Sequence, residues 1–299
     1  MTTSTTAPTP RARRASTDAR KRGPRRLIVL LDRASLVVGA LLFASPIVYM
    51  VLGSFQPSQD VLGGLSVFTP DNLTTANYAG LVDRFDGADT GYFFGFLGVS
   101  LLVTSVVVVC GLVVNSLAGY ALARLRWRGK DLVLVLVLAL VTLPFEAVAV
   151  PLFYMLSGMR DTVTVQALPF VASAFSIYLF HSFFSELPVE VEEAATLDGA
   201  GAWRTFVSVI VPMSKPVFAS AAILTFLTQW GSFLWPVLVV SDPAVRPLPL
   251  AISVFQGQPP YDWGQIMAFG VVMVTPVLIV FLAFQRWFVQ SLASSAVKG

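Results

Sequence analysis

The stretch Glu193-Ala194-Ala195-Thr196-Leu197-Asp198-Gly199 joins two strongly apolar segments of the chain. Pro188 precedes it at a place where a helix tolerates proline, because an N–H in the first turn has no partner inside the helix. Acidic residues then follow near the positive end of the helix dipole, and Gly199 suits the position just after a helix end. The pattern predicts a polar helix of about three turns between two membrane-spanning segments.

One face of this predicted helix is made of small residues. Val191, Ala194 and Ala195 share that face, because positions three and four apart lie above one another on a helix. The two alanines make the face flat enough for the surface of another protein to approach closely. We interpret the segment as a docking helix, and an amphipathic connector that lies on the membrane surface is the alternative.

The composition identifies an integral membrane protein. Of the 299 residues 56% are hydrophobic and only 12% are charged, and the mean hydropathy is +0.75. Because about 20 apolar residues cross a bilayer as a helix, the long uncharged runs predict an all-α membrane protein with six transmembrane helices. These continuous runs differ from the alternating pattern of a membrane β-barrel. The predicted spans fall within residues 34–59, 90–123, 132–159 (interrupted by Glu146), 162–185, 216–241 and 263–285.

The basic residues predict the orientation of these spans. If the N-terminus is inside, 17 of the 20 Lys and Arg residues face the cytoplasm and only Arg84, Arg160 and Arg246 lie outside. The excess of positive charge inside therefore predicts that both termini and the segment around Glu193 are cytoplasmic. It also explains the net charge of +3 without a nucleic-acid partner.

The first 26 residues differ in composition from the rest of the chain. They are rich in Thr, Pro, Ala and Arg and lack a periodic apolar pattern, so residues 1–26 are expected to form a disordered basic cytoplasmic tail that is attracted to anionic lipid headgroups. The first apolar run is longer than the apolar region of a signal peptide and is expected to remain as a span. Residues 27–299 are then one transmembrane domain.

The sequence lacks the motifs of a nucleotide-binding or hydrolytic protein. Gly129-Lys130 is followed by Asp131 and has no glycine five positions before it, so there is no phosphate-binding loop. His181 is the single histidine and Cys110 the single cysteine, which leaves no zinc motif, no disulfide and no credible pair of nucleophile and base. We therefore predict no catalytic residues, no metal site and no cofactor in this chain, and we predict that it is not an enzyme.

Glu146 is the one acidic residue within the predicted spans. It lies between Pro144 and Pro151, each of which removes a backbone hydrogen bond, so the helix is expected to be kinked or unwound there. A carboxylate at this depth must face protein, water or headgroups, which makes Glu146 a candidate residue of the transport pathway. In the alternative interpretation it caps backbone N–H groups or pairs with a neighbouring subunit.

Aromatic and polar side chains meet in the fifth predicted span. Trp230 and Trp235 occur with Gln229 and Ser232, and an aromatic face beside hydrogen-bonding groups is what a sugar ring requires. Anchoring of the tryptophans at the membrane interface is the competing account.

The chain resembles the inner-membrane permeases of binding-protein-dependent ABC importers, in the carbohydrate class typified by the second maltose permease. Their EAA signature is matched by Glu193, Ala194, Ala195 and Gly199, followed at the family spacing by residues 209–212, and Asp198-Gly199-Ala200 has the form of the sugar class. Further similarity lies in residues 119–124, 144–151, 230–236 and 296–299, so the resemblance covers residues 34–299.

This resemblance implies the partners of the chain. A second related permease would form a heterodimer with it, an extracytoplasmic sugar-binding protein would deliver the cargo, and two cytoplasmic ATPase subunits would bind ATP and Mg. The helix carrying Glu193, Ala194, Ala195, Asp198 and Gly199 would sit in an ATPase cleft, and the tail Val297, Lys298 and Gly299 would contact the ATPases. The setting would be a bacterial inner membrane.

Three positions depart from the family pattern. Trp230-Gly231-Ser232 replaces a common Trp-Asn-Asp, His181 replaces a common Arg, and residues 290–295 replace a Gly-rich stretch. An ion-coupled secondary transporter is the alternative from another class, but it would require several intramembrane carboxylates or an inverted repeat. A membrane enzyme is a third possibility, which lacks catalytic groups.

Overall fold

The computed structural model describes residues 23–68, 72–257 and 261–296, and the chain divides into two units, Met1–Tyr49 and Met50–Gly299. In the first unit, the described residues belong to helix α1 (Gly23–Gly53), which contains an apolar stretch, Val29–Gly53, long enough to cross a bilayer. The first turn of α1 falls within the segment 1–26 that the sequence analysis assigned to a tail. Residues 1–22 of that tail lie outside the described residues.

The second unit is mainly helical. Its described part also contains one short hairpin, in which β1 (Asp86–Gly87) pairs antiparallel with β2 (Gly91–Tyr92). This hairpin departs from the all-α fold predicted from the sequence. The helical segments are α2 (Ser58–Val61), η1 (Gly64–Phe68), α3 (Ala76–Arg84), α4 (Phe93–Ala123), α5 (Lys130–Val141), α6 (Phe145–Met155), η2 (Ser157–Met159), α7 (Val163–Val171), α8 (Ala174–Ser185), α9 (Val189–Leu197), α10 (Ala202–Thr205), η3 (Phe206–Ile210), α11 (Val211–Met213), α12 (Lys215–Trp230), α13 (Leu234–Val239), η4 (Pro243–Val245), α14 (Leu248–Gln256) and α15 (Trp263–Ala296).

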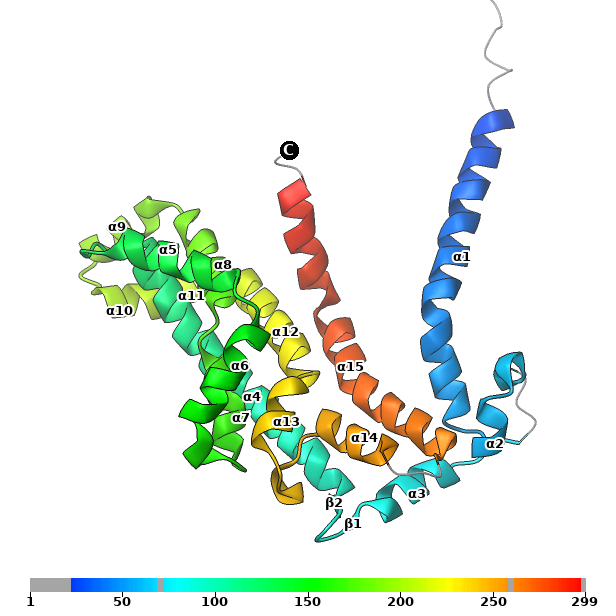
Figure 1. The fold of residues 1–299 in the computed structure, drawn as a ribbon. Helices are drawn as coiled ribbons and strands as arrows, with labels where there is room; N and C mark the ends of the chain where they lie inside the picture. Colours follow the sequence, from blue (N-terminus) through cyan, green and yellow to red (C-terminus); the bar gives the residue numbers. More distant parts are fainter. Residues whose placement is uncertain (1–22, 69–71, 258–260, 297–299) are drawn as a thin grey trace, which may run out of the picture. The chain divides into compact units, whose positions relative to one another are not determined.

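The long helix α4 organises the second unit. It packs along α7 and α8 and against α12, and α12 in turn packs on α15 (Figure 1). The approach of α8 is close because α4 presents Gly119 at the crossing, where an added Cβ would lie 2.5 Å from the Cβ of Phe180. A small residue at such a crossing lets the two backbones meet, as is common in membrane helix pairs.

The apolar helices account for four to six membrane spans among the described residues. Four stretches are long and apolar enough by themselves, and two further pairs of helices qualify only if each bent pair is one span. The predicted count of six is therefore reached only with both bent pairs. The four stretches are Val29–Gly53, Phe93–Ala123, Val163–Ser185 and Trp263–Phe284.

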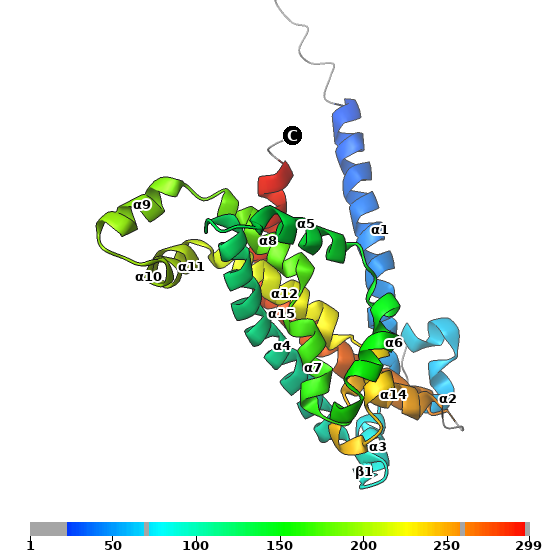
Figure 2. The same cartoon turned by 60° about the vertical axis from the view of Figure 1, so that its left-hand side comes forward.

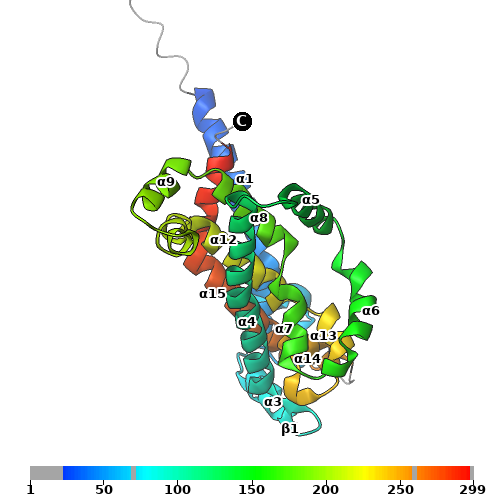
Figure 3. The same cartoon turned by 90° about the vertical axis from the view of Figure 1, so that its left-hand side faces the viewer.

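The third predicted span is broken in two. Helices α5 and α6 meet at 103°, and Figures 2 and 3 show them as separate rods with different directions. The break falls where Pro144 directly precedes α6, which agrees with the kink expected there. The second bent pair, Ala202–Met213 and Lys215–Trp230, meets at 79°, so a helical stretch not foreseen as part of a span precedes the predicted fifth span.

The fourth span contains a smaller break between α7 and α8, and one side chain of α4 satisfies its backbone. The Asn115 side chain donates from Nδ2 to the carbonyl of Val171 at 3.0 Å and accepts from the N–H of Ser173 at 2.9 Å. Because hydrocarbon offers no hydrogen bonds, exposed backbone at this depth needs partners from within the protein. Asn115 supplies two of them.

Aromatic side chains fill the core where α4 approaches the segment that carries α9. Tyr120 of α4, Phe180 and Phe184 of α8, and Phe206 and Ile210 of η3 form one buried cluster. Figure 2 shows α9, α10 and α11 together at this end of α4. The cluster packs α4, α8 and η3 together, and the α9 segment connects α8 to η3 in the sequence.

Candidate functional site

The segment predicted to dock on another protein is a helix, α9, which runs over Val189–Leu197. Pro188 lies immediately before it, with φ −58° and ψ 130°, and not inside the first turn as expected. Glu190 and Glu192 lie in the first turn, where a carboxylate is favourable beside the positive end of the helix dipole.

Gly199 ends α9 in a left-handed conformation, with φ +79°. The N–H of Ala200 donates to the carbonyl of Ala195 at 2.9 Å, and the N–H of Gly199 donates to the carbonyl of Thr196 at 3.0 Å. This pair of hydrogen bonds is the Schellman motif, which favours glycine because it has no Cβ to clash. The role of Gly199 as the helix stop is therefore visible in the backbone.

Most of the residues assigned to docking lie on the exposed side of α9 and its cap. Glu193, Ala194, Asp198 and Gly199 are exposed, and Ala195 is half-buried. Leu197, in the last turn of α9, is 89% exposed within this chain.

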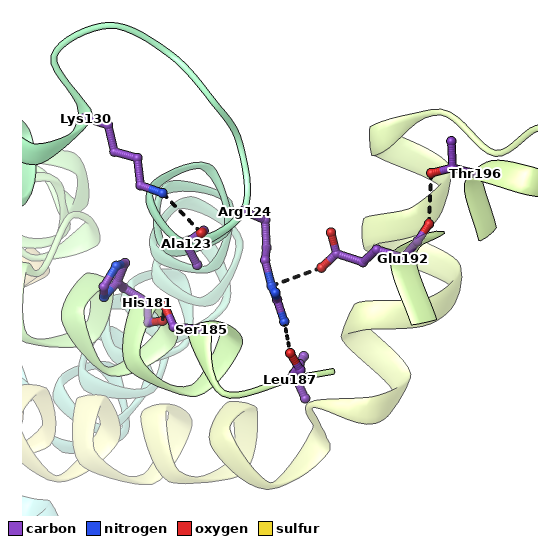
Figure 4. A network of polar contacts seen from close by, with 8 residues as sticks. All are labelled: Ala123, Arg124, Lys130, His181, Ser185, Leu187, Glu192 and Thr196. Carbon is purple, nitrogen blue, oxygen red and sulfur yellow. Dashed lines mark hydrogen bonds and ion pairs between the residues drawn. The ribbon is translucent and has the colours of Figure 1, made fainter. Parts of the chain in front are cut away.

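The inner side of α9 is held by an ion pair that the sequence analysis did not identify. Arg124 Nε lies 3.0 Å from Glu192 Oε1, and only 12% and 18% of the two side chains are exposed. Arg124 Nη2 also donates a hydrogen bond to the carbonyl of Leu187, in the turn between α8 and α9 (Figure 4). The sequence places a basic residue at the end of a span and an acidic residue in the first turn of a helix. It does not show that the two residues lie close together.

Further polar contacts lie near Arg124, at the end of α4 and within α8. The Lys130 ammonium donates to the carbonyl of Ala123 at 3.2 Å, close to the end of the helix (Figure 4). Positive groups are favourable there because the last carbonyls of a helix carry partial negative charge. The half-buried His181 ring stacks on Tyr178, and the hydroxyl of Ser185 donates to the backbone carbonyl of His181.

Three of the four candidate pathway residues come together. Gln229, Trp230 and Ser232 line one small cavity with Ser100, Thr104 and Gln166, at the point where α12 ends. The cavity has a volume of about 10 Å³, which is room for about one water molecule.

Both tryptophans of this region are buried in the protein. The indole N–H of Trp230 donates to the carbonyl of Met273, and its ring stacks on Phe226. The indole N–H of Trp235 donates to the carbonyl of Val165 at 2.8 Å. Only 2% of Trp230 and 1% of Trp235 is exposed, so within this chain both rings pack as core and not as anchors at a membrane surface.

Glu146 lies apart from this cavity. It is exposed in the first turn of α6, and its side chain has neither a hydrogen bond nor an ion pair to any other described residue. The predicted caps on backbone N–H groups are thus not formed within this part of the chain. The tail residues Val297, Lys298 and Gly299 lie outside the described residues.

Comparison with known proteins places the chain in a family. Residues 115–294 match the binding-protein-dependent transport system inner membrane component. The chain belongs to this family. As a member of it, the chain is a membrane permease.

Relatives of this permease cover almost its full length. It is 32% identical to the trehalose/maltose transport system permease protein MalG of Thermococcus litoralis, over 90% of this chain and 98% of the relative. It is 33% identical to the trehalose transport system permease protein SugB of Mycobacterium tuberculosis, over 93% and 100% of the two chains. Its fold matches a chain in the crystal structure of a bacterial ABC transporter involved in the import of the acidic polysaccharide alginate, with a TM-score of 0.76 at 22% identity, over 88% and 97% of the two chains.

Proposed function

We propose that this chain is one of two permease subunits in an ATP-driven carbohydrate importer of a bacterial inner membrane. The observation that carries the proposal is near full-length similarity to permeases named for trehalose/maltose, lactose and arabinooligosaccharide transport. A second, related permease would complete the pathway, a sugar-binding protein would deliver the cargo from outside, and two ATPase subunits would bind ATP and Mg inside.

The proposed site of ATPase contact is the exposed side of α9 with its cap. Glu193, Ala194, Ala195, Asp198 and Gly199 form it, and Leu197 adds an apolar side chain. Support for a cytoplasmic location comes from the charge of the chain, because 17 of its 20 Lys and Arg residues fall on the same side as α9 when the N-terminus is inside. The tail residues Val297, Lys298 and Gly299 are proposed to reach the same partners.

The proposed cargo pathway forms only between two permeases. The cavity beside Gln229, Trp230 and Ser232 has about 10 Å³, far less than a sugar ring fills. The exposed carboxylate of Glu146, which has no partner among the described residues, is proposed to face the second permease or the pathway. Opening of the pathway would then depend on movement between the two subunits.

Reconstitution tests this function against the ion-coupled alternative. The complex of this chain with its partner permease and ATPases is placed in vesicles with ATP inside and without an ion gradient, and uptake of trehalose, maltose, lactose and arabinooligosaccharides is measured with the binding protein outside. We expect ATP-dependent uptake of at least one sugar, and neither uptake nor ATP hydrolysis by this chain alone. In a parallel preparation, vesicles with this chain alone are given a proton or sodium gradient. Sugar uptake driven by that gradient would favour a secondary transporter instead.

A further inference from the structure

Two neighbouring carboxylates of α9 have different surroundings. Glu193 is exposed, whereas only 18% of the Glu192 side chain is exposed and its Oε1 lies 3.0 Å from Arg124 Nε. Successive residues of a helix are turned by about 100° from one another, so one carboxylate can face a partner while the next faces the body of the protein. Glu192 is therefore the carboxylate that ties α9 to its own chain.

Arg124 stands at a junction of three elements. It is the residue that follows the last turn of α4, and its own N–H donates to the carbonyl of Tyr120 at 2.9 Å. Its guanidinium contacts Glu192 in the first turn of α9 and donates to the carbonyl of Leu187 after α8 (Figure 4). One side chain thus joins the end of α4, the end of α8 and the start of α9.

The charges at this junction suit their positions. A guanidinium at the end of α4 lies beside carbonyls with partial negative charge, and a carboxylate at the start of α9 lies beside N–H groups with partial positive charge. The Arg124 Nε–H does not point at Glu192 Oε1 with hydrogen-bond geometry, so the contact is an ion pair and not a hydrogen bond. The low exposure of both side chains reduces screening by water and salt.

Other packing between α9 and the spans is light. Helix α9 contacts α10 and η3 over short stretches, while the buried cluster around Tyr120 and Phe184 holds α4 against α8 and η3. A displacement of α9 can therefore reach α4 by two routes, through η3 and the buried cluster or directly through the ion pair. The pair is well placed to connect the docking helix to the central helix of the second unit.

We propose that Arg124 and Glu192 are positioning residues that transmit movement of α9 to α4. The proposal rests on the proposed function, in which an ATPase contacts the exposed side of α9. In that setting Arg124 keeps α9 in register with the span, so that closure of the ATPases moves α4 instead of bending the turn at Leu187. Removal of either charge leaves its partner poorly compensated and frees α9 from α4.

The test compares Arg124→Ala and Glu192→Gln with matched controls. Arg126→Ala removes an exposed arginine two residues away, and Asp131→Asn removes an exposed carboxylate from the first turn of another helix, α5. In the reconstituted complex we measure basal ATPase activity, its stimulation by sugar-loaded binding protein, sugar uptake, and the melting temperature. The controls should match wild type in all four measurements.

We expect Arg124→Ala and Glu192→Gln to keep basal ATPase activity and to lose about fivefold or more of the stimulation and of the sugar taken up per ATP. The double variant should be no worse than either single variant, because both changes break the same pair. The swap Arg124→Glu with Glu192→Arg should restore part of the stimulation, since it returns opposite charges to the junction.

Three outcomes would overturn the proposal. One is normal stimulation in both single variants, and another is losses that multiply in the double variant. The third is a proportional fall of basal activity, stimulated activity and melting temperature, with no rescue by the swap, because that pattern indicates local folding only. Absence of stimulation by the binding protein in the wild-type complex would instead contradict the proposed function of the chain. That result is distinct from the three outcomes that contradict the role of the ion pair.

Discussion

Gly199 shows how a single backbone angle sets the geometry of the docking segment. Its φ of +79° allows the two hydrogen bonds that turn the chain away from α9. A Cβ at this position would meet no atom of the described chain within 4 Å, so any effect within this subunit comes from the backbone and not from crowding. The crowding that a docked ATPase would add is a separate effect.

Gly199→Val should therefore weaken the end of α9 by about 1 to 2 kcal/mol, because a side chain with a Cβ clashes in the left-handed conformation. We expect the variant to insert and assemble normally, but to lose most sugar uptake and most ATPase stimulation. Gly199→Asn is the matched control, since asparagine tolerates this conformation, and it should keep more of both activities. Equal activity of the Val variant and wild type would show that the cap does not control docking.

At the scale of elements, the crossing of α4 and α8 depends on Gly119. A Cβ there would lie 2.5 Å from the Cβ of Phe180 and 3.1 Å from the carbonyl oxygen of Ile177. Both neighbours belong to or sit directly on the α8 backbone, so the helix itself would have to move. Phe180 is also fully buried in the aromatic cluster next to the α9 segment.

Gly119→Ala should accordingly lower the stability of the purified chain by about 1 to 3 kcal/mol, as overpacking does in tightly packed cores. Gly98→Ala is the control in the same helix, because a Cβ at Gly98 meets nothing within 4 Å. Melting temperatures in detergent check the difference. A melting temperature of Gly119→Ala as high as that of Gly98→Ala would mean that α4 and α8 separate without loss of stability.

A second element-scale contact joins the loop before α7 to the loop after α13. The Asp161 carboxylate accepts the backbone N–H groups of Ser241 and Asp242, and the Arg160 guanidinium donates to the hydroxyl of Ser241. The N–H of Asp242, then that of Ser241, holds the pKa of the Asp161 carboxyl below its usual range. The stabilisation from a lowered pKa is present above the pKa of the unfolded chain, about 3.9, and is lost as the pH falls through the folded value.

Asp161→Asn should then lose less stability than wild type as the pH falls, because asparagine does not take up a proton. Asparagine suits the φ of 57° at this position and keeps one carbonyl oxygen as acceptor, so the loop backbone should be retained. Melting temperatures of wild type and variant, measured from neutral pH down to about pH 3, check the prediction. Asp89→Asn removes an exposed carboxylate and should leave the wild-type profile unchanged. A profile of Asp161→Asn identical to wild type would contradict the expectation.

The elements that could be predicted from sequence are those set by local signals. Apolar runs predicted the four stretches that are long enough to span a bilayer by themselves, Pro144 predicted the break before α6, and Gly199 predicted the end of α9. The contacts that could not be predicted join residues far apart in the chain, such as Arg124 with Glu192, or Asn115 with the break before Ser173. Each of these partners has an ordinary role by itself, and only the packing of α4 against α8 brings them together.

At the scale of the whole molecule, Glu146 is the acidic residue of the predicted spans, and its side chain has no partner among the described residues. Its carboxylate is exposed at the start of α6, beside the 103° bend, without a partner among the described residues. A charge in or near the membrane needs water, headgroups or protein to compensate it. Since the proposed importer contains a second permease, that subunit is the partner we expect for Glu146.

Glu146→Leu should change the melting temperature of the isolated chain only slightly, because the side chain makes no hydrogen bond or ion pair with a described residue and only its favourable position in the first turn of α6 is lost. In the complex, the same change should lower the yield or melting temperature of the permease pair, since the donors of the second subunit lose their acceptor at about 1 to 3 kcal/mol. Glu146→Gln, which keeps an acceptor of similar shape, is the matched control and should retain assembly and most sugar uptake. If Glu146→Gln assembles normally and abolishes uptake, then ionisation of Glu146 takes part in transport, and pairing between the two permeases is the wrong account of this residue.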